Sequence, residues 1–263
     1  MTSMTPRVGL LLREWRQRRR FSQLDLALAA DTSARHVSYV ETGRSRPSRA
    51  MVLRLCEVLE VPLRERNTVL LAGGYAPEYR ESGLDGAELA AVREALDAIL
   101  AAHEPYPAVV VDLHWNVVIG NKAMAVLMAG IPEHLLTPEM NVYRLVLHPE
   151  GLIRHLDNAH QIRDLFLERL TRQVSATGDE RLRELLAETS AYPPPPEPDP
   201  RPVEPGPFAV PMRIRTPMGV LSMFSTMATF GAPADVTLSE LAIELFYPLD
   251  EFTATALRGV AVP

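Results

Sequence analysis

Serine, glycine and proline residues divide the first 72 residues of the chain into short segments with helical periodicity. In the first segment, Val8, Leu11, Leu12 and Trp15 follow the i, i+3, i+4, i+7 spacing of one apolar helix face. Three later segments begin directly after a serine that is suited to be an N-cap, and Pro62 opens the last one. These capping residues are Ser22, Ser33 and Ser48. We therefore expect this part of the chain to form five short helices.

The second and third of these helices have the spacing of a helix-turn-helix pair. We expect Leu24, Ala27 and Leu28 to face inward from the second helix, and Val37 and Val40 to be buried by the third. Such a third helix fits the major groove of DNA, where an arginine can bond O6 and N7 of guanine. The residues left to point outward from it are Arg35, His36, Ser38 and Tyr39.

The charge of the chain is divided unevenly. Residues 1–72 hold 13 Arg and 7 acidic residues, a balance of +6, and the remaining residues hold 14 Lys+Arg and 26 Asp+Glu, a balance of −12. A basic segment on an acidic body suggests contact with a polyanion. Gln23 is placed to bond a phosphate, and Arg44 and Arg46 would follow the DNA backbone. A helical protein-interaction module with a solvated basic face is the alternative interpretation.

Two sequence elements in this region keep a spacing that resembles Xre/Cro-type helix-turn-helix regulators. The matching residues are Ser22-Gln23-Leu24-Asp25-Leu26-Ala27, Ser33, Val37, Tyr39-Val40-Glu41-Thr42-Gly43 and Arg44-Ser45-Arg46-Pro47-Ser48. The resemblance covers residues 8–72 and implies a five-helix DNA-binding domain whose third helix reads bases. The reader positions of the family fall on Ala34, Arg35, Ser38 and Tyr39, with Ser33 before them and His36 beside them. Ala34 departs from the polar residue frequent at its position, so contact there is expected to be apolar or absent.

Composition excludes several other classes of protein. Hydrophobic residues make up 47% of the 263 residues, enough to build a substantial core. A single cysteine, Cys56, excludes a disulfide scaffold and a cysteine-rich zinc module, and its place on an apolar helix face predicts a core residue. No apolar run approaches the 18 residues of a membrane span, and the N-terminus has no signal-peptide pattern, so we expect a cytoplasmic protein.

A loop of glycine, proline and charged residues at 73–83 predicts a domain boundary. We divide the chain into a helix-turn-helix domain at 1–73, a linker with a connecting helix at 74–104, and a ligand-binding body at 105–263. The apolar seam of the connecting helix either pairs two protomers or packs on its own domain. Nine of the fifteen residues 193–207 are proline, which predicts an extended surface loop.

The sequence pattern of the body predicts two strands, then helices, then three strands and a final helix. This order is PAS-like: a five-stranded antiparallel sheet with helices gathered over one face, which can enclose a small molecule. The fold class is therefore α+β and multidomain, with an all-α head followed by a PAS-like α/β domain. The expected strands are 108–112, 115–120, 208–215, 219–230 and 239–247, and the expected helices include 122–129, 160–174, 179–190 and 249–258.

Short motifs along residues 107–258 resemble the MmyB-like regulators. They are Pro107-Ala108-Val109-Val110-Val111-Asp112, Trp115-Asn116, Asn121-Lys122-Ala123, Asn141-Val142-Tyr143-Arg144-Leu145, Leu147-His148-Pro149-Glu150-Gly151, Phe230-Gly231, Asp235-Val236-Thr237-Leu238-Ser239-Glu240-Leu241 and Tyr247-Pro248. Together with the Xre-type head, the resemblance implies a transcription regulator with a PAS-like ligand-binding domain. It further implies an acyl-chain, fatty-acid-like ligand for at least some members.

Strand alternation indicates which side chains line a pocket. Val109 and Val111 share one face, and Trp115, Val117 and Ile119 are expected to share another. The expected ligand-binding residues are Val111, Trp115, Val117, Ile119, Met124, Leu127, Tyr143, Arg144, Leu147 and Met223. The candidate partners of a carboxylate head group are Arg144, His148, Arg213 and Arg215. For each apolar residue taken singly, a plain core position is the alternative.

These features predict a sequence-specific regulator that binds double-stranded DNA as a homodimer and whose operator affinity changes when a small apolar ligand binds. The alternative is a ligand-independent repressor whose body serves only dimerisation. Catalysis is not predicted, because the sequence has neither a G-x-S-x-G element nor a glycine-rich phosphate loop. The spacings between His148, His155 and His160 do not place two imidazoles on one helix face, so no metal site is expected.

Overall fold

The structure is a computed structural model that describes residues 7–196 and 210–260. The chain divides into two compact units. The first unit combines the residues up to 83 with Ala232–Ser239, and the second combines Leu84–Gly231 with the residues from 240 onward. In the sequence, Ala232–Ser239 lies between two strands of the second unit.

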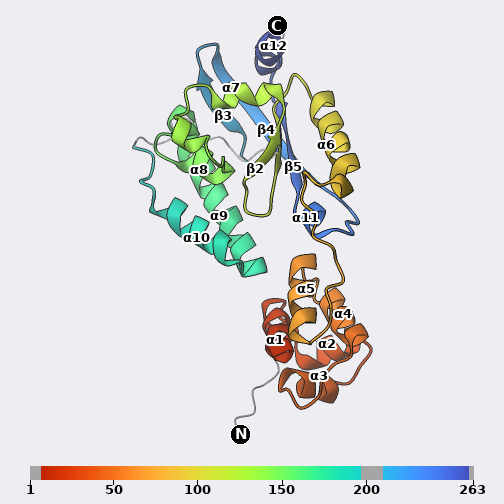
Figure 1. Cartoon of the computed structure of the whole chain (residues 1–263). Coiled ribbons are helices and arrows are strands. Elements are labelled where there is room, and N and C mark those ends of the chain that lie inside the picture. Colours follow the sequence, from red (N-terminus) through yellow and green to blue (C-terminus); the bar gives the residue numbers. More distant parts are fainter. Residues whose placement is uncertain (1–6, 197–209, 261–263) are drawn as a thin grey trace. The chain divides into compact units, whose positions relative to one another are not determined.

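The regular elements of the first unit are helices in its described part (Figure 1). Its helices are α1 (Arg7–Arg18), α2 (Gln23–Ala29), α3 (Ala34–Glu41), α4 (Arg49–Val58), α5 (Leu63–Ala72) and the short α11 (Val236–Ser239). The three capping serines act as the sequence predicts. The side-chain oxygens of Ser22, Ser33 and Ser48 each accept a hydrogen bond from the backbone N–H three residues later. This satisfies one of the free donors at the start of α2, α3 and α4.

The core of the first unit confirms the inward positions of α1 and α3 and that of Ala27 on α2, but it corrects the other two positions of α2. Val8, Leu12 and Trp15 are buried, as are Val37, Val40 and Cys56, whereas Leu24 and Leu28 are 58% and 71% exposed. The inward residues of α2 are Leu26 and Ala27, followed by Ala30. Gln23 lies on this same inward side, where its side-chain amide donates to Glu41 at 2.8 Å, so a polar residue belongs to the buried face that the apolar pattern alone misplaces.

The described part of the second unit contains a five-stranded antiparallel sheet, which confirms the predicted fold class. The strands are β1 (Ala108–Val111), β2 (Val117–Gly120), β3 (Met212–Thr216), β4 (Gly219–Thr229) and β5 (Ala242–Pro248), in the order β2-β1-β5-β4-β3. The pairing of β1 with β5 brings together segments more than a hundred residues apart. Most of the proline-rich segment 193–207, and the expected start of β3 at Phe208, lie outside the described residues.

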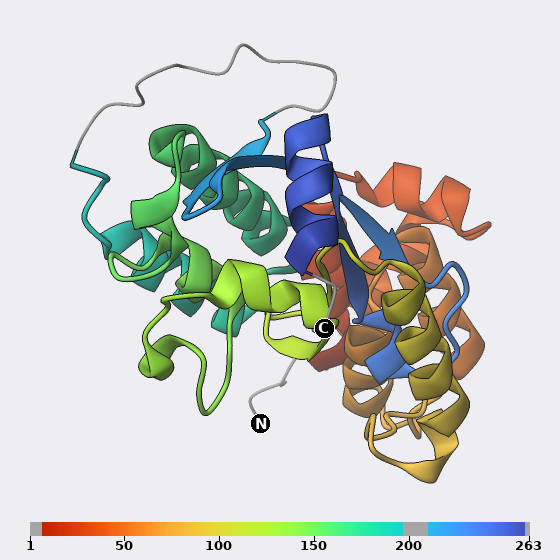
Figure 2. The same cartoon turned by 90° about the horizontal axis from the view of Figure 1, so that it is seen from above.

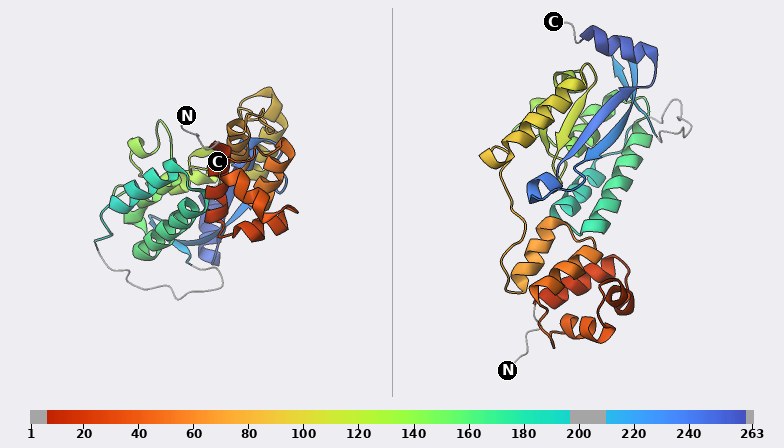
Figure 3. Two further views of the ribbon diagram at one scale, coloured as in Figure 1. Left: turned by 90° about the horizontal axis from the view of Figure 1, so that it is seen from below. Right: turned by 90° about the vertical axis from the view of Figure 1, so that its right-hand side faces the viewer.

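The sheet is covered by helices on both faces, which corrects the expectation of helices over one face. The helices are α6 (Ala90–Ala102), α7 (Ala125–Met128), α8 (Val142–Leu147), α9 (Ala159–Thr177), α10 (Glu180–Ala191) and α12 (Glu251–Val260). α7 to α10 lie on one side, with α9 and α10 side by side, and α6 lies on the other (Figures 1, 2 and 3). All four residues of β1 are therefore buried. Of the apolar seam predicted for this region, Leu89 and Leu96 are buried in their own unit, whereas Ile99 is 39% exposed.

Candidate functional site

The surface of α3 presents basic side chains around one aromatic ring. Arg35 donates through Nε to the Tyr39 hydroxyl at 2.9 Å, and its guanidinium lies 5.2 Å from the centre of that ring. Arg44, which follows the helix, lies 5.9 Å from the same ring. Both arginines are exposed. Each guanidinium has five N–H donors, so both keep donors for base edges or phosphates.

A buried ion pair joins α1, α2 and α3. Glu41 accepts hydrogen bonds from Nε and Nη2 of Arg16, at 2.6 and 2.9 Å, and from Nε2 of Gln23 at 2.8 Å. The hydrogen bond to Glu41 raises the pKa of Arg16. These bonds fix the start of α2 against the end of α3, which is the relation that a helix-turn-helix pair has to maintain.

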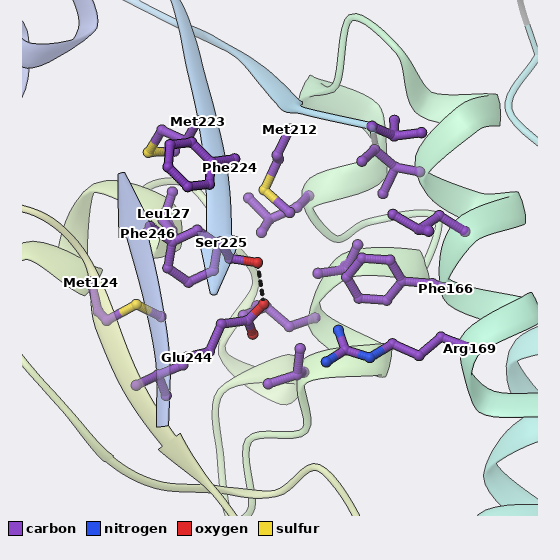
Figure 4. A pocket seen from close by; sticks show the side chains of 18 of the residues that line it. Met124, Leu127, Phe166, Arg169, Met212, Met223, Phe224, Ser225, Glu244 and Phe246 are labelled. Carbon is purple, nitrogen blue, oxygen red and sulfur yellow. Dashed lines mark hydrogen bonds between the residues drawn. The ribbon is translucent and has the colours of Figure 1, made fainter. Parts of the chain in front are cut away.

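An enclosed apolar cavity of about 80 Å³ lies between the sheet and helices α7 to α9 of the second unit (Figure 4). Strands of both halves of the sheet contribute, with Val109 from β1, Met223 from β4 and Phe246 from β5. From the helical side, Phe166 of α9 and Leu127 of α7 complete the wall. The remaining lining residues are Val117, Met124, Val142, Leu145, Val146, Leu152, Ile162, Leu165, Arg169, Val210, Met212, Phe224, Ser225 and Glu244.

Three of the lining residues are polar and lie together (Figure 4). The Ser225 hydroxyl donates to Oε1 of Glu244 at 2.7 Å. Glu244 is 5% exposed, and burial raises the pKa of its carboxyl group, while the bond from Ser225 opposes that shift. Arg169 reaches toward them from α9, and its guanidinium stacks 4.4 Å from the centre of the Trp115 ring. The cavity is therefore amphipathic, with one polar group in an apolar wall.

A second, wider cavity of about 510 Å³ shares two residues with the first. Leu127 and Leu152 line both, so these two side chains separate the cavities. The second cavity is otherwise lined by Ala125, Val126, Ala129, Gly130, His155, Ile214, Arg215, Thr216, Pro217 and Met218. It lies between the α7 region and the β3–β4 turn.

Comparison with known families settles the class of the chain. Residues 7–69 match a helix-turn-helix domain family, and residues 92–259 match the MmyB-like transcription regulator ligand binding domain. The chain belongs to the MmyB-like transcription regulators. No curated protein matches it. The predicted resemblance of both parts is thereby confirmed, and the regulator combines a DNA-binding helix-turn-helix with a ligand-binding domain. Within the described residues, no helix has both the length and the hydropathy needed to span a membrane.

The expected DNA-contacting residues of the regulator occupy different environments. Ser33 caps α3 and is exposed, whereas Ala34 is half-buried and packs against the core. His36, Ser38 and Tyr39 are half-buried on α3. Arg46 has an internal role that the sequence does not predict, because its Nη2 donates to the Gly73 carbonyl at 2.8 Å and its guanidinium lies 5.3 Å from the centre of the Tyr75 ring. The side-chain amide of Gln23 is likewise engaged, by Glu41.

Of the ten expected ligand-binding residues, four line the enclosed cavity: Val117, Met124, Leu127 and Met223. Val111, Trp115, Tyr143 and Leu147 lie in the surrounding core. Ile119 lies on the other face of the sheet, which corrects its predicted side. A register irregularity between Val110 and Val111 pairs Val117 with Val111 but Ile119 with Val110. The second strand also begins later than predicted, since Asp112 accepts hydrogen bonds from the backbone of His114 and Asn116 in the turn.

None of the expected partners of a carboxylate head group lines the enclosed cavity. Arg144 pairs with Glu188 at 2.7 Å, and this bond lowers the pKa of Glu188. Arg213 and Arg215 both pair with Asp157. His148 packs edge-on against Tyr192. Arg169 and Glu244 do line the enclosed cavity, and the sequence motifs do not single them out. A signal existed, because strand alternation puts Glu244 on the same face as Phe246.

One further cluster joins residues that the sequence analysis did not group. His134, His148 and Glu150 have potential ligand atoms within 4.8 Å of one another. His134 lies near Glu150, at 3.5 Å from Nε2 to Oε2, and the rings of the two histidines are edge to face at 5.5 Å. His134 and Glu150 are exposed.

Proposed function

We propose that the regulator binds double-stranded operator DNA as a homodimer through α3 and that a small ligand with an apolar body, such as a fatty acid, changes its operator affinity. The observation that carries the proposal is the enclosed cavity, because an unfilled, largely apolar space inside a packed domain is a binding site by default. Its Met124, Met212 and Met223 side chains can adapt to a flexible chain.

The size of the cavity constrains how such a ligand binds. A dry engineered cavity of about 150 Å³ holds benzene, and the enclosed cavity here is about 80 Å³. An acyl chain therefore needs more room than this cavity offers. The adjoining space of about 510 Å³ supplies it if Leu127 and Leu152 move apart. In this proposal the chain of the ligand passes between these two leucines.

The connectivity of the chain offers a route for coupling. Ser225 and Glu244 lie on β4 and β5, and the chain between these strands, Ala232–Ser239, folds with the first unit. There Asp235 accepts a hydrogen bond from the Ser82 backbone at 3.1 Å, and the backbone N–H of Val236 donates to the Arg80 carbonyl at 2.8 Å. A ligand that shifts β5 against β4 would pull on this segment. A coupling of about 1–3 kcal/mol changes operator affinity by about 5- to 150-fold.

The first experiment asks whether the cavity is occupied and whether occupancy matters. Native mass spectrometry of the purified regulator, followed by denaturing extraction, is expected to show a bound acyl compound. Selection from a random DNA library supplies an operator, and palmitate is then titrated against operator binding. Palmitate is expected to change the dissociation constant, and Asp235→Ala is expected to reduce that change while palmitate still binds.

A cavity-filling variant tests the site itself. Leu127→Trp is expected to abolish palmitate binding and the palmitate effect on operator affinity. Ile99→Trp is the matched control, because Ile99 is 39% exposed on α6, on the opposite face of the sheet. Equal palmitate binding in both variants would show that palmitate binds outside this cavity. Operator binding without any palmitate effect would favour the ligand-independent repressor.

A further inference from the structure

The cluster of His134, His148 and Glu150 joins two segments that the fold brings together. His134 lies in the 3-10 turn Glu133–Leu135, within the connection from α7 to α8, and the other two residues lie in the turn that follows α8 (Figure 1). Each residue offers one nitrogen or oxygen atom, and these atoms lie within 4.8 Å of one another. The expectation that the chain has no metal site rested on histidines of a single helix, and it does not describe a group that crosses two turns.

The turn that carries His134 is fixed on both sides. Leu135 is 6% exposed and belongs to the core of the second unit. The backbone N–H and the hydroxyl of Thr137 both donate to the Glu133 carbonyl, at 2.9 and 3.1 Å. The backbone of His134 therefore has little freedom, whereas its side chain is 56% exposed and has room to rotate.

The turn that carries His148 and Glu150 is constrained as well. The backbone N–H of Gly151 donates to the His148 carbonyl at 2.7 Å. A Cβ at residue 151 would lie 2.3 Å from the Leu145 carbonyl oxygen, so glycine is the residue that fits there. The His148 ring packs edge-on against Tyr192 at 5.2 Å. The two turns are thus built before any ion binds, which lowers the entropy cost of binding one.

The separation of two of the candidate ligands suits a small divalent ion. Zn²⁺ is bound by imidazole nitrogen at about 2.0–2.1 Å and by carboxylate oxygen at about 2.0–2.2 Å, which places tetrahedral ligand atoms about 3.4 Å apart. Nε2 of His134 lies 3.5 Å from Oε2 of Glu150. This is longer than an N–H···O hydrogen bond of about 2.7–3.2 Å. The two atoms are therefore spaced as neighbouring ligands of one ion.

His148 is the ligand that would give up a contact. The backbone N–H of Glu150 donates to its Nδ1 at 3.1 Å. A neutral imidazole with an accepting Nδ1 carries its hydrogen on Nε2, so coordination through either nitrogen replaces this hydrogen bond. The loss is small beside the free energy of zinc coordination. The same contact holds the His148 ring close to Glu150 until an ion binds.

We propose that His134, His148 and Glu150 form a site for one divalent first-row transition-metal ion, and Zn²⁺ is the ion that tests it. Three protein ligands of the histidine and carboxylate type, with water in the fourth position, form a known class of zinc site. Mg²⁺ and Ca²⁺ prefer shells of oxygen ligands, which this group does not offer. The bound ion would close the chain between the two histidines into a loop and so stabilise the second unit. This site goes beyond the proposed function and does not depend on it.

The test uses the full-length regulator without an affinity tag, stripped of metal by a chelator. Isothermal titration calorimetry is expected to show one Zn²⁺ site per chain. Zn²⁺ is expected to raise the melting temperature, because it binds the folded state. It is also expected to slow hydrogen exchange in peptides that cover residues 134–151. An excess of Mg²⁺ is expected to change none of these readouts.

Three substitutions each remove one ligand. His134→Ala and Glu150→Gln alter side chains that are 56% and 59% exposed, so both variants are expected to fold. His148→Phe removes the nitrogens and keeps an aromatic ring against Tyr192. Each variant is expected to weaken Zn²⁺ binding by more than about 100-fold, since loss of even an outer-shell partner costs about 10- to 100-fold. His160→Gln is the matched control, because it removes an imidazole of α9 that lies outside the cluster.

Two results would overturn the metal site. Equal Zn²⁺ affinity in the parent regulator, in His134→Ala and in Glu150→Gln would show that zinc binds elsewhere on the chain. Absence of binding to the parent at millimolar Zn²⁺ would leave His134 and Glu150 as an ion pair only. Neither result bears on palmitate binding, so failure of the metal site and failure of the proposed function are distinguished.

Discussion

Removal of Glu41 is the perturbation with the largest expected effect on the DNA-binding unit. The Glu41 side chain is 2% exposed and that of Arg16 is 11% exposed. Glu41→Ala deletes two hydrogen bonds from Arg16 and one from Gln23, and so leaves a guanidinium without its counter-ion next to the core. The three helices that the carboxylate joins lose their common contact.

The magnitude follows from what remains after the substitution. Removing one partner of a buried ion pair costs about 3–5 kcal/mol, because the other charge is left uncompensated. Arg16 keeps its bond to the Phe21 carbonyl at 2.8 Å and reaches some solvent, which places the cost at the lower end. We expect Glu41→Ala to lower the free energy of unfolding of the first unit by about 3 kcal/mol.

The exposed pair between Arg54 and Asp31 is the matched control. Its side chains are 48% and 86% exposed, so we expect Asp31→Asn to change stability by less than about 0.5 kcal/mol. Asparagine also suits the left-handed backbone of residue 31, which has φ of 49°. Thus the control removes the charge without adding backbone strain.

Hydrogen exchange in increasing urea, read by mass spectrometry, resolves unfolding of the first unit from that of the second. Operator binding is measured in parallel, since a displaced α3 would lose specific affinity. If Glu41→Ala lowers the free energy of unfolding of the first unit by less than about 1 kcal/mol, or if Asp31→Asn lowers it equally, burial of the ion pair does not determine its contribution to stability.

Three further tests, the first with a control substitution, address other parts of the molecule. Gly9→Ala is expected to destabilise the first unit in thermal melts, because its Cβ would lie 2.2 Å from the Val40 carbonyl oxygen. Gly259→Ala is the control: its Cβ meets open space, so it is expected to be neutral or slightly stabilising. Arg35→Ala is expected to weaken specific operator binding by about 1–3 kcal/mol more than non-specific binding; equal losses on both DNAs in a gel-shift titration would make Arg35 a phosphate contact. Because burial raises the folded pKa of Glu244, its contribution to stability is present below the unfolded pKa and is lost as pH rises through the folded pKa. The Glu244→Gln variant is therefore expected to have a higher melting temperature than the parent at alkaline pH and the same melting temperature in acid. The reverse order would contradict a raised pKa of the buried Glu244 carboxyl group.

Local features of the sequence predicted the helical unit well. A serine N-cap bonds a backbone N–H only three residues away, so the starts of α2, α3 and α4 depend on their own few residues. The inward face of α2 was mispredicted because it depends on a distant partner. Gln23 faces inward to reach Glu41, eighteen residues further along, and apolar periodicity carries no sign of that bond.

The second unit shows the same division between local and distant information. The hairpin of β1 and β2 follows from alternation and a turn, whereas the central position of β1 depends on its pairing with β5. The face of Ile119 was wrong because one register irregularity in the ladder reverses every later side chain. Alternation predicts Val117 and Met223 at the cavity wall, but it does not predict that Leu127 also borders a second cavity.

The choice of head-group partner illustrates why charge alone is an unreliable guide to a site. Arg144, Arg213 and Arg215 were favoured as cations near the ligand motifs, yet each pairs with an acid in the folded unit. An arginine whose donors are already accepted loses as much as it gains by turning to a ligand. Arg169 pairs with no acid among the described residues and lines the cavity, with its guanidinium over the Trp115 ring. Whether an arginine already has an internal partner therefore becomes visible only when the fold has placed the distant acids.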